Sequence, residues 1–205
     1  MTERIDRRYA QAGALTGYRD LVYGLVAEQL HAIGPIASAV DVGAGEGWYA
    51  SRLTEDGVVG RIVPLEVIRR DHVLIEPTLY DGVTIPLGDR SMELAYAVDV
   101  VHHAQDPLAL LGEIARVADR WILLKDHTWT TRAGRYALAI LDELGNRRFG
   151  IPSPGRYQRD FEWVTYLKTH GFEQARMMYP AVCQTGALGA LTNRLQFIAL
   201  FERRA

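Results

Sequence analysis

The chain has 205 residues, of which 48% are hydrophobic and 23% are charged, proportions that exclude a disordered or fibrous chain and fit one globular domain. Its 23 basic and 25 acidic side chains give a formal net charge of -2, so we expect no nucleic-acid partner, because no basic field is available to hold a phosphate backbone. Cys183 is the single cysteine, which excludes an intramolecular disulfide and a cysteine-rich zinc cluster.

The start of the chain and its hydropathy give a first expectation about location. The stretch MTERIDRRYAQAGAL lacks the apolar run of a signal peptide. No segment approaches the roughly 18 consecutive apolar residues of a membrane span. We therefore expect a cytoplasmic protein with no membrane span.

The first half of the chain alternates predicted helices and strands. Hydrophobic residues recur at helical spacing over residues 18–33, and Gly34-Pro35 ends that pattern. The next predicted elements are a strand at 37–42, a glycine turn, a helix at 48–54 and a strand at 61–67. A short third strand is expected within 73–75, and a clearer strand at 93–98.

The second half continues the alternation. Asp106-Pro107 predicts a helix start, because an aspartate caps free amide groups and proline costs nothing at the first helical position. Further predicted elements are a helix to residue 118, a strand at 121–125, helices at 132–144 and 160–170, and strands at 172–178 and 194–202 joined by a glycine-rich loop.

This order predicts an α/β fold: a Rossmann-like three-layer sandwich with a seven-stranded, mostly parallel sheet and an antiparallel C-terminal strand. Sheets of this kind bind ligands at the carboxyl ends of their strands.

The stretch VDVGAGEGW at residues 40–48 has glycine at every second position between a predicted strand and a predicted helix. Backbone amides can approach a ligand closely there, beside the positive end of the helix. Dinucleotides and S-adenosylmethionine both use this arrangement. The dinucleotide pattern G-x-G-x-x-G needs glycine at position 48, where the chain has Trp48. Asp41 would repel a pyrophosphate but can receive an ammonium group, directly or through water. A tight turn with Asp41 as a local cap is the alternative.

Several segments together resemble the class I S-adenosylmethionine-dependent methyltransferases. VDVGAGEG resembles the glycine motif of that family. DGVTIPLGDRSME, residues 81–93, is similar to the family's D-x-x-x-L-P-F-x-D-x-S-F-D, with departures at Ile85, Leu87, Met92 and Glu93. AVDVVHHAQDP, residues 97–107, is similar to the family's His-His segment and Asp-Pro helix start. The resemblance covers about residues 37–127, and the chain also looks like a small bacterial methyltransferase of the type 11 kind.

The resemblance implies S-adenosylmethionine as the cofactor, S-adenosylhomocysteine as its product, and a small-molecule methyl acceptor, with secondary metabolites among the candidates. It assigns the ribose hydroxyls to Glu66, although an acid there also fits a dinucleotide. It assigns the adenine amino group to Asp81, with a plain turn as the alternative. The expected cofactor-binding residues are Asp41, Gly43, Ala44, Gly45, Glu66, Val67, Asp81, Gly82, Val98 and Asp99.

Polar residues follow the predicted fourth and fifth strands, where catalysis is expected. A general base helps where the acceptor is a hydroxyl. We expect His127 in that role, with Asp126 to orient a neighbouring imidazole and His102 as a further catalytic candidate. Helix capping or packing beneath the cofactor is the alternative for His102 and His103. The histidines are few, and Glu113 and Asp126 show no ligand spacing, so we expect no metal site.

Residues 128–159 exceed what the fold needs after its fifth strand, and excursions of this length are usually functional or flexible. We expect an acceptor pocket and lid made from this insert and the N-terminal helix, with both simply covering the sheet edge as the alternative. The residues expected there are Tyr9, Tyr18, His103, Trp129, Asn146 and Tyr157.

We expect one methyltransferase domain over residues 1–205. Its parts are an N-terminal helical cap at 1–35, a cofactor-binding half at 36–127, an insert or lid at 128–159, and a C-terminal helix with strands at 160–205. A homodimer is left open. Two other functions stay open as well: a cofactor-binding protein of the same fold without methyl transfer, and a nicotinamide-dependent oxidoreductase.

Overall fold

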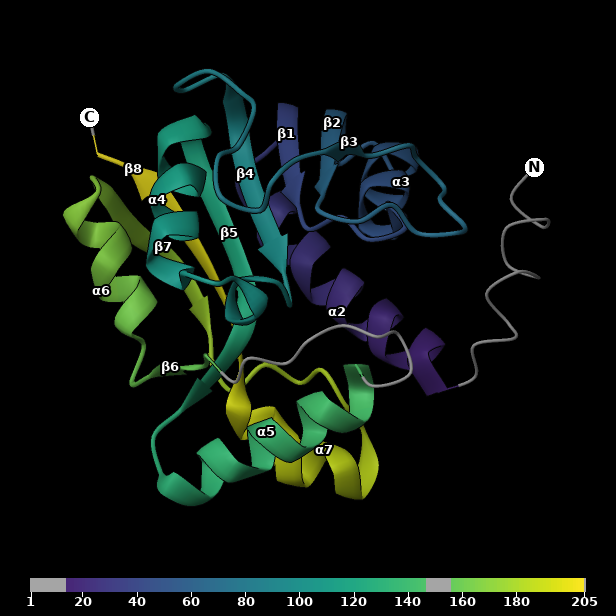
Figure 1. Ribbon diagram of the computed structural model, residues 1–205, viewed down its shortest axis with the longest axis vertical. Coiled ribbons are helices and arrows are strands. Elements are labelled where there is room, and N and C mark those ends of the chain that lie inside the picture. The colour runs from purple at the N-terminus through teal and green to yellow at the C-terminus, as the bar shows by residue number, and fades with distance from the viewer. Residues whose placement is uncertain (1–13, 147–155, 205) are drawn as a thin grey trace.

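The computed structural model describes residues 14–146 and 156–204 and places helices on both faces of one central sheet (Figure 1). The helices are α2 (Ala14–His31), α3 (Trp48–Glu55), α4 (Pro107–Val117), α5 (Arg132–Asn146), α6 (Glu162–Thr169) and α7 (Gly186–Thr192), with short 3-10 turns η2 (Val101–His103) and η4 (Asn193–Leu195). The strands are β1 (Ile36–Val42), β2 (Val59–Glu66), β3 (Thr78–Leu79), β4 (Met92–Val98), β5 (Ala118–Trp129), β6 (Gln158–Arg159), β7 (Phe172–Met178) and β8 (Gln196–Arg203).

The strand order confirms the predicted Rossmann-like sandwich. The main path of seven strands runs β3-β2-β1-β4-β5-β8-β7, and the two-residue β6 pairs with the end of β5. The strand β8 is antiparallel to both of its neighbours, β5 and β7, while the other pairs of the path are parallel. The order reverses at β1, between β2 and β4. Ligands bind such open sheets at that reversal, outside the carboxyl ends of the strands.

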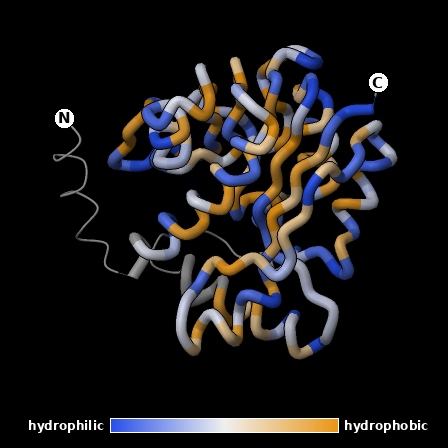
Figure 2. The backbone as a smooth tube through the Cα atoms, turned by 180° about the vertical axis from the view of Figure 1, so that it is seen from behind, coloured by the Kyte–Doolittle hydropathy of each residue, from blue (hydrophilic) through white to orange (hydrophobic). Residues whose placement is uncertain are grey.

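Two hydrophobic clusters cover the two faces of the sheet. On one face Leu111 and Ile114 of α4 and Leu167 of α6 pack with Ile122 and Leu124 of β5. On the other face the α2 residues Val22, Val26 and Leu30 pack with residues that include Leu123. Successive β5 side chains therefore enter opposite layers, as the pleat of a strand requires. Figure 2 shows the hydrophobic residues concentrated along these central strands.

The predicted start of α4 is confirmed. Asp106 Oδ1 accepts hydrogen bonds of 3.0 Å from the amides of Leu108 and Ala109, and Pro107 takes the first helical position. Helices α5 and α7 lie beyond the carboxyl end of the sheet (Figure 1). A third small cluster, in which Leu138 of α5 meets Tyr157 and Leu195, anchors α5 there. Within the described residues no helix is both long enough and apolar enough to cross a membrane.

The position of the third strand differs from the prediction. Residues 73–75 form a loop, and the strand is β3 at Thr78–Leu79, paired with the end of β2. The amide of Leu74 donates to the carbonyl of Glu46 at 2.7 Å, so the loop is tied to the glycine turn instead of the sheet. The first helix also begins earlier than residue 18, at Ala14, and ends at His31.

The fifth strand and the tail differ as well. The strand β5 extends to Trp129 instead of residue 125, because its pairing with β8 continues to His127 opposite Gln196. Asp126 and His127 therefore lie inside the strand, whereas the sequence placed them after it. The glycine-rich segment between the last two strands contains α7 and η4, where a loop was predicted.

Candidate active site at the carboxyl edge of the sheet

The glycine turn joins β1 to α3 as predicted. Gly43, Gly45 and Gly47 have φ angles of 77°, 59° and 76°, a region that favours glycine. The amides of Gly43 and Ala44 donate to the carbonyl of Leu65 at 2.9 and 2.8 Å, which fixes the turn against β2. A Cβ at Gly43 would lie 2.5 Å from Val100 Cγ2, so the backbone of the turn touches the segment that follows β4.

Asp41 lies one residue before the end of β1 and is 3% exposed. Its Oδ2 has no hydrogen-bond partner among the described residues. Burial, together with the nearby Glu66 carboxylate, raises the pKa of Asp41 to about 7. The Tyr96 hydroxyl lowers that pKa but does not offset burial. A buried carboxylate oxygen without a hydrogen bond is costly, so the site is suited to a ligand that brings a positive charge or a hydrogen-bond donor.

Glu66 ends β2 and completes the acidic side of the turn. Its Oε2 accepts from the amide of Gly45 at 2.8 Å and its Oε1 from the amide of Val67 at 2.7 Å. The amide of Tyr80 also donates to the carbonyl of Glu66, so the segment that contains Asp81 runs beside the end of β2. A Cβ at Gly82 would lie 3.0 Å from Val67 Cγ1. The structure therefore brings Glu66, Val67, Asp81 and Gly82 together.

Asp81 is exposed and holds its own turn. Its Oδ1 accepts from the amides of Val83 and Thr84, both at 2.8 Å, and these bonds hold the pKa of the carboxyl below its usual value. The role of Asp81 in a plain turn, the alternative raised by the sequence, is therefore observed for Oδ1. The sequence assigned this carboxylate to the adenine amino group, and that role stays a prediction.

An ion pair between a buried lysine and a partly exposed aspartate lies at the carboxyl ends of β4 and β5. Lys125 of β5 is fully buried, and its Nζ donates to Asp99, to the hydroxyl of Tyr18 and, at 2.7 Å, to Gln196 Oε1. The Tyr18 hydroxyl donates to Asp99 Oδ2 at 2.7 Å. Asp99 follows Val98, the last residue of β4, and has a φ of 57°. Through these contacts Tyr18 of α2, which was predicted for the acceptor pocket, lies at the carboxyl edge of the sheet.

The Lys125 side chain also favours the ionised form of Asp99. Burial alone would raise the pKa of Asp99, but the Lys125 ammonium and His127 outweigh it and hold the pKa below its usual value. Asp99 was predicted to bind the cofactor. Its carboxylate contacts Tyr18, Lys125 and His127, and cofactor binding by Asp99 stays a prediction.

His102, Asp126 and His127 form a second polar cluster at the same edge. His102 Nδ1 lies 2.6 Å from Asp126 Oδ1, and His127 Nδ1 lies 3.3 Å from the same oxygen. Asp126 Oδ2 accepts from the amide of Val101 at 3.0 Å, and Oδ1 accepts from the amide of His127 at 2.7 Å. The structure therefore brings together the three residues that the sequence named as catalytic.

The members of this cluster differ in exposure and charge. His102 and Asp126 are each 1% exposed, whereas the His127 side chain is 15% exposed. Burial opposes the charge on Asp126, but His102 and His127 outweigh it and hold its pKa well below the usual range. Burial lowers the pKa of His127, so this imidazole is neutral near pH 7. A neutral, partly exposed imidazole beside an ionised carboxylate can accept a proton.

The glycine turn and the histidine cluster are neighbours. Val100 packs on the backbone of Gly43, and the next residue, Val101, donates its amide to Asp126. Only the segment with Val100 and Val101 therefore separates the glycine turn from the histidine cluster.

The insert contributes one wall of the cluster. The Tyr157 ring stacks on His102 with the centroids 5.5 Å apart, and its carbonyl accepts from Trp129 Nε1 at 3.2 Å. The His103 ring lies 4.0 Å from that of His102. Asn146 ends α5, but its side chain lies outside the described part of the structure, as do Tyr9 and residues 147–155 of the predicted lid.

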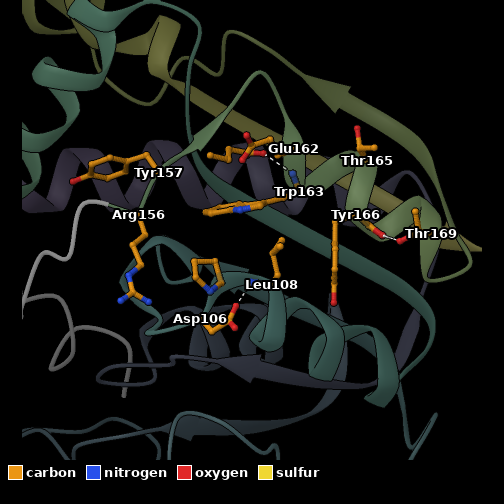
Figure 3. Close-up of a pocket in the computed structure, with 11 residues that line it drawn as sticks. Asp106, Leu108, Arg156, Tyr157, Glu162, Trp163, Thr165, Tyr166 and Thr169 are labelled. Atoms are coloured by element: carbon orange, nitrogen blue, oxygen red, sulfur yellow. Dashed lines mark hydrogen bonds between the residues drawn. The ribbon is translucent and has the colours of Figure 1, made fainter.

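A cavity of about 580 Å³ lies between the N-terminal end of α4 and the length of α6, with Tyr157 in its lining (Figure 3). Arg156, Trp163 and Tyr166 are among its lining residues, and Figure 3 shows the Trp163 indole lying across its middle. None of the glycine-turn residues lines it. Tyr157 is the one predicted acceptor residue that it shares, so this cavity is separate from the predicted cofactor position.

The sequence missed Lys125 and Gln196. A lysine within WILLKDHTW is an unusual choice for a buried strand, and this was the available signal. The sequence contains no comparable signal for Gln196, because this residue comes close to Lys125 only through the pairing of β5 with β8.

Comparisons with known proteins agree with this geometry. A family profile described as a methyltransferase domain matches residues 40–120, from the end of β1 to the start of β5. No curated protein matches the chain.

Solved structures show the same fold. Magnesium protoporphyrin IX methyltransferase from Synechocystis PCC 6803, with bound S-adenosylhomocysteine, is 18% identical, with 98% of this chain and 99% of that chain covered and a TM-score of 0.60. Geranyl diphosphate C-methyltransferase from Streptomyces coelicolor is 12% identical, with 88% and 80% covered and a TM-score of 0.64. The cyclase SpnF is 15% identical, with 90% and 80% covered and a TM-score of 0.63.

Proposed function

We propose that the chain transfers a methyl group from S-adenosylmethionine to a small-molecule acceptor, because residues 40–120 match a profile described as a methyltransferase domain and lie in a Rossmann-like sheet. The cofactor would lie in the glycine turn. The acceptor would lie at the carboxyl ends of β4 and β5, next to the histidine cluster.

The unpartnered Oδ2 of Asp41 carries the cofactor assignment. This oxygen is buried and makes no hydrogen bond within the described residues, and the Tyr96 hydroxyl is the one side-chain donor that lowers the pKa of the carboxyl. The ammonium group of an amino-acid tail would satisfy it, directly or through water, and would favour the ionised form of a carboxyl whose pKa is about 7. A pyrophosphate would instead meet two carboxylates, Asp41 and Glu66. The residues of the turn therefore fit S-adenosylmethionine better than a dinucleotide.

The other cofactor roles follow from position. S-adenosylmethionine, when bound, supplies an electrophilic methyl group on a sulfonium. Glu66 accepts two backbone amides and keeps lone pairs for the ribose hydroxyls. Asp81 accepts its turn amides through Oδ1, so Oδ2 is left for the adenine amino group, with Val67 and Gly82 beside it. Val98 and Asp99 close the site at the end of β4.

The histidine cluster supplies the acid–base chemistry of the proposal. His127 is neutral and the more exposed histidine of the pair that contacts Asp126, so it receives the proton of the acceptor. Asp126 orients both imidazoles and stabilises the positive charge. His102 is buried and acts by holding Asp126. The acceptor pocket is formed by Tyr18, His103, Trp129 and Tyr157, with Asn146 at the end of α5.

A small-molecule acceptor has the support of two structural neighbours, whose names give magnesium protoporphyrin IX and geranyl diphosphate as substrates. The cyclase SpnF has the same fold and a different activity in its name, so a protein that binds the cofactor without methyl transfer is the competing function. The location that we expect is the cytoplasm, where the free, buried Cys183 stays reduced.

Calorimetric titration with S-adenosylhomocysteine tests the cofactor assignment, with a nicotinamide dinucleotide as the parallel ligand. We expect binding of the first and none of the second. Glu66→Gln should weaken the binding at least tenfold, since a charge-assisted hydrogen bond contributes about 1.5–3 kcal/mol, whereas the exposed Glu28→Gln should leave it unchanged. Binding of the dinucleotide alone would refute the proposal.

Incubation with S-adenosylmethionine and a panel of hydroxyl, amine and carbon acceptors then tests transfer. Formation of S-adenosylhomocysteine together with a methylated acceptor supports it. Tight cofactor binding without product from any acceptor would favour the competing function.

A further inference from the structure

Three potential metal ligands meet at the end of β5. One ligand atom each from His102, Asp126 and His127 can be chosen so that all three atoms lie within 4.8 Å of one another. The sequence did not predict this cluster as a metal site, because Asp126 and His127 are adjacent in β5 and His102 comes from η2, after β4. Neither spacing alone resembles a metal motif.

The distances suit coordination. The Nδ1 atoms of His102 and His127 lie 2.6 and 3.3 Å from Asp126 Oδ1. Ligands held about 2.0–2.2 Å from a metal lie about 3 Å from one another. The contact of His102 with Asp126 is the shorter of the two. A small movement of the His102 ring away from Asp126 Oδ1 would therefore admit an ion. The more exposed His127 gives the cluster its access to solvent.

Neighbouring groups already fix the orientation of two of these ligands, Asp126 and His102. Two backbone amides, from Val101 and His127, donate to the Asp126 carboxylate and fix its orientation without using either imidazole. The Tyr157 ring stacks on His102 and limits its rotation. Supporting contacts of this kind orient the ligands of metal sites. Asp99 Oδ1 lies 3.7 Å from His127 Nδ1, but its charge is paired with Lys125, so Asp126 supplies the net negative charge.

The donor set selects the class of ion. Two imidazoles and one carboxylate suit Zn²⁺, Mn²⁺, Fe²⁺ or Co²⁺, whereas Mg²⁺ and Ca²⁺ prefer oxygen ligands only. Three protein ligands also leave open positions, as in catalytic metal sites and unlike closed structural ones.

We propose that His102, Asp126 and His127 bind a divalent first-row transition-metal ion whose open position holds an oxygen or nitrogen atom of the acceptor. This proposal deepens the proposed function, and only its assignment of the open position rests on it. The ion lowers the pKa of a bound acceptor hydroxyl, and the hydroxyl proton passes to solvent. His127 is then a ligand, so the ion takes over the activation that His127 provides in the metal-free protein.

Titration of the untagged, full-length protein with Zn²⁺ and Mn²⁺ after dialysis against a chelator tests the site. We expect one ion per chain, with much weaker Mg²⁺ binding. His127→Gln and Asp126→Asn should each weaken binding at least tenfold. His31→Gln, which changes an exposed histidine at the end of α2, should bind as the wild type does. Circular dichroism identifies any variant that fails to fold, and the more exposed His127 is the safer position.

Co²⁺ gives a second readout, because its visible absorption changes when imidazole ligands are lost. Absence of ion binding by the wild type, or equal binding by the folded His127→Gln variant, would overturn the proposal. Titration of the same samples with S-adenosylhomocysteine separates the two proposals. Cofactor binding without ion binding removes the metal site alone, whereas ion binding without cofactor binding removes the proposed function alone.

Discussion

His102 Nδ1 lies 2.6 Å from Asp126 Oδ1, and this contact joins the segment after β4 to the interior of β5. Both side chains are 1% exposed. The same carboxylate accepts the amide of Val101, which follows the residue that packs on Gly43. Asp126 therefore ties the histidine cluster to the glycine turn, and its charge should matter for stability as well as for activity.

The first prediction concerns how the free energy of unfolding changes as the pH is lowered. The pKa values of Asp126 and His127 are both lowered, so each contributes stability that is present above its unfolded pKa and lost as the pH falls. Wild-type unfolding free energy should decline below about pH 6.5 because of His127 and again below about pH 4 because of Asp126.

Asp126→Asn should lose about 3 kcal/mol at pH 7, since one partner of a buried pair is removed, and should lack the second decline. His127→Gln should lack the first. Urea unfolding at a series of pH values measures both. Identical pH profiles in all three proteins would contradict the assignment of these two groups.

The second prediction is that Asp41→Asn has opposite effects on stability and on binding. The pKa of Asp41 is raised to about 7, so its stabilising contribution is full below its unfolded pKa and is lost as the pH rises to 7. At pH 8 the variant should therefore unfold with a higher free energy than the wild type, by on the order of 1 kcal/mol or more.

Binding gives the complementary result for Asp41. The wild type should bind S-adenosylhomocysteine about tenfold more weakly at pH 6 than at pH 8, because the protonated carboxyl no longer attracts an ammonium group. The Asp41→Asn variant should bind weakly at both pH values. Calorimetry at the two pH values measures this, and a wild-type affinity that does not change would argue against contact with the ammonium.

A third prediction separates two glycines of the turn. Both have a positive φ, but a Cβ at Gly43 would lie 2.5 Å from Val100, whereas a Cβ at Gly45 meets no atom within 4 Å. Gly45→Ala should cost about 1 kcal/mol for the left-handed backbone, and Gly43→Ala should cost clearly more. Thermal unfolding compares them, and Gly43→Ala with Val100→Ala should recover part of the difference. Equal costs would mean that Val100 does not press on the turn.

The fourth prediction concerns the ion pair between Lys125 and Asp99. Lys125→Met should lose on the order of 2 kcal/mol, less than a fully buried pair, because Asp99 loses its cation but is 24% exposed. The double variant Lys125→Met with Asp99→Asn, which keeps a residue type that tolerates the left-handed backbone at position 99, should be more stable than Lys125→Met alone. Tyr18→Phe removes one hydroxyl from the network and should cost about 1 kcal/mol. Urea unfolding of the set measures the coupling, and simple additivity would show that Lys125 and Asp99 do not act together.

Much of the cofactor half could be read from the chain. Alternating strands and helices, the Asp106-Pro107 helix start and the glycine turn depend on local sequence, and all three are confirmed by the structure. The third strand was misplaced because two residues of β3 carry almost no periodic signal. The end of β5 was misplaced because its last residues pair with β8, about 70 positions later in the chain.

By itself the sequence determined the fold class, the acidic glycine turn and the identity of the polar residues after β4, because these follow from local periodicity, backbone conformation and residue chemistry. The tertiary structure decided which of those residues meet. Pairing of β4 with β5 brings His102 to Asp126, and packing of α2 on the sheet brings Tyr18 to Asp99 and Lys125. Contacts between residues so far apart depend on strand register and layer packing, which no local pattern specifies.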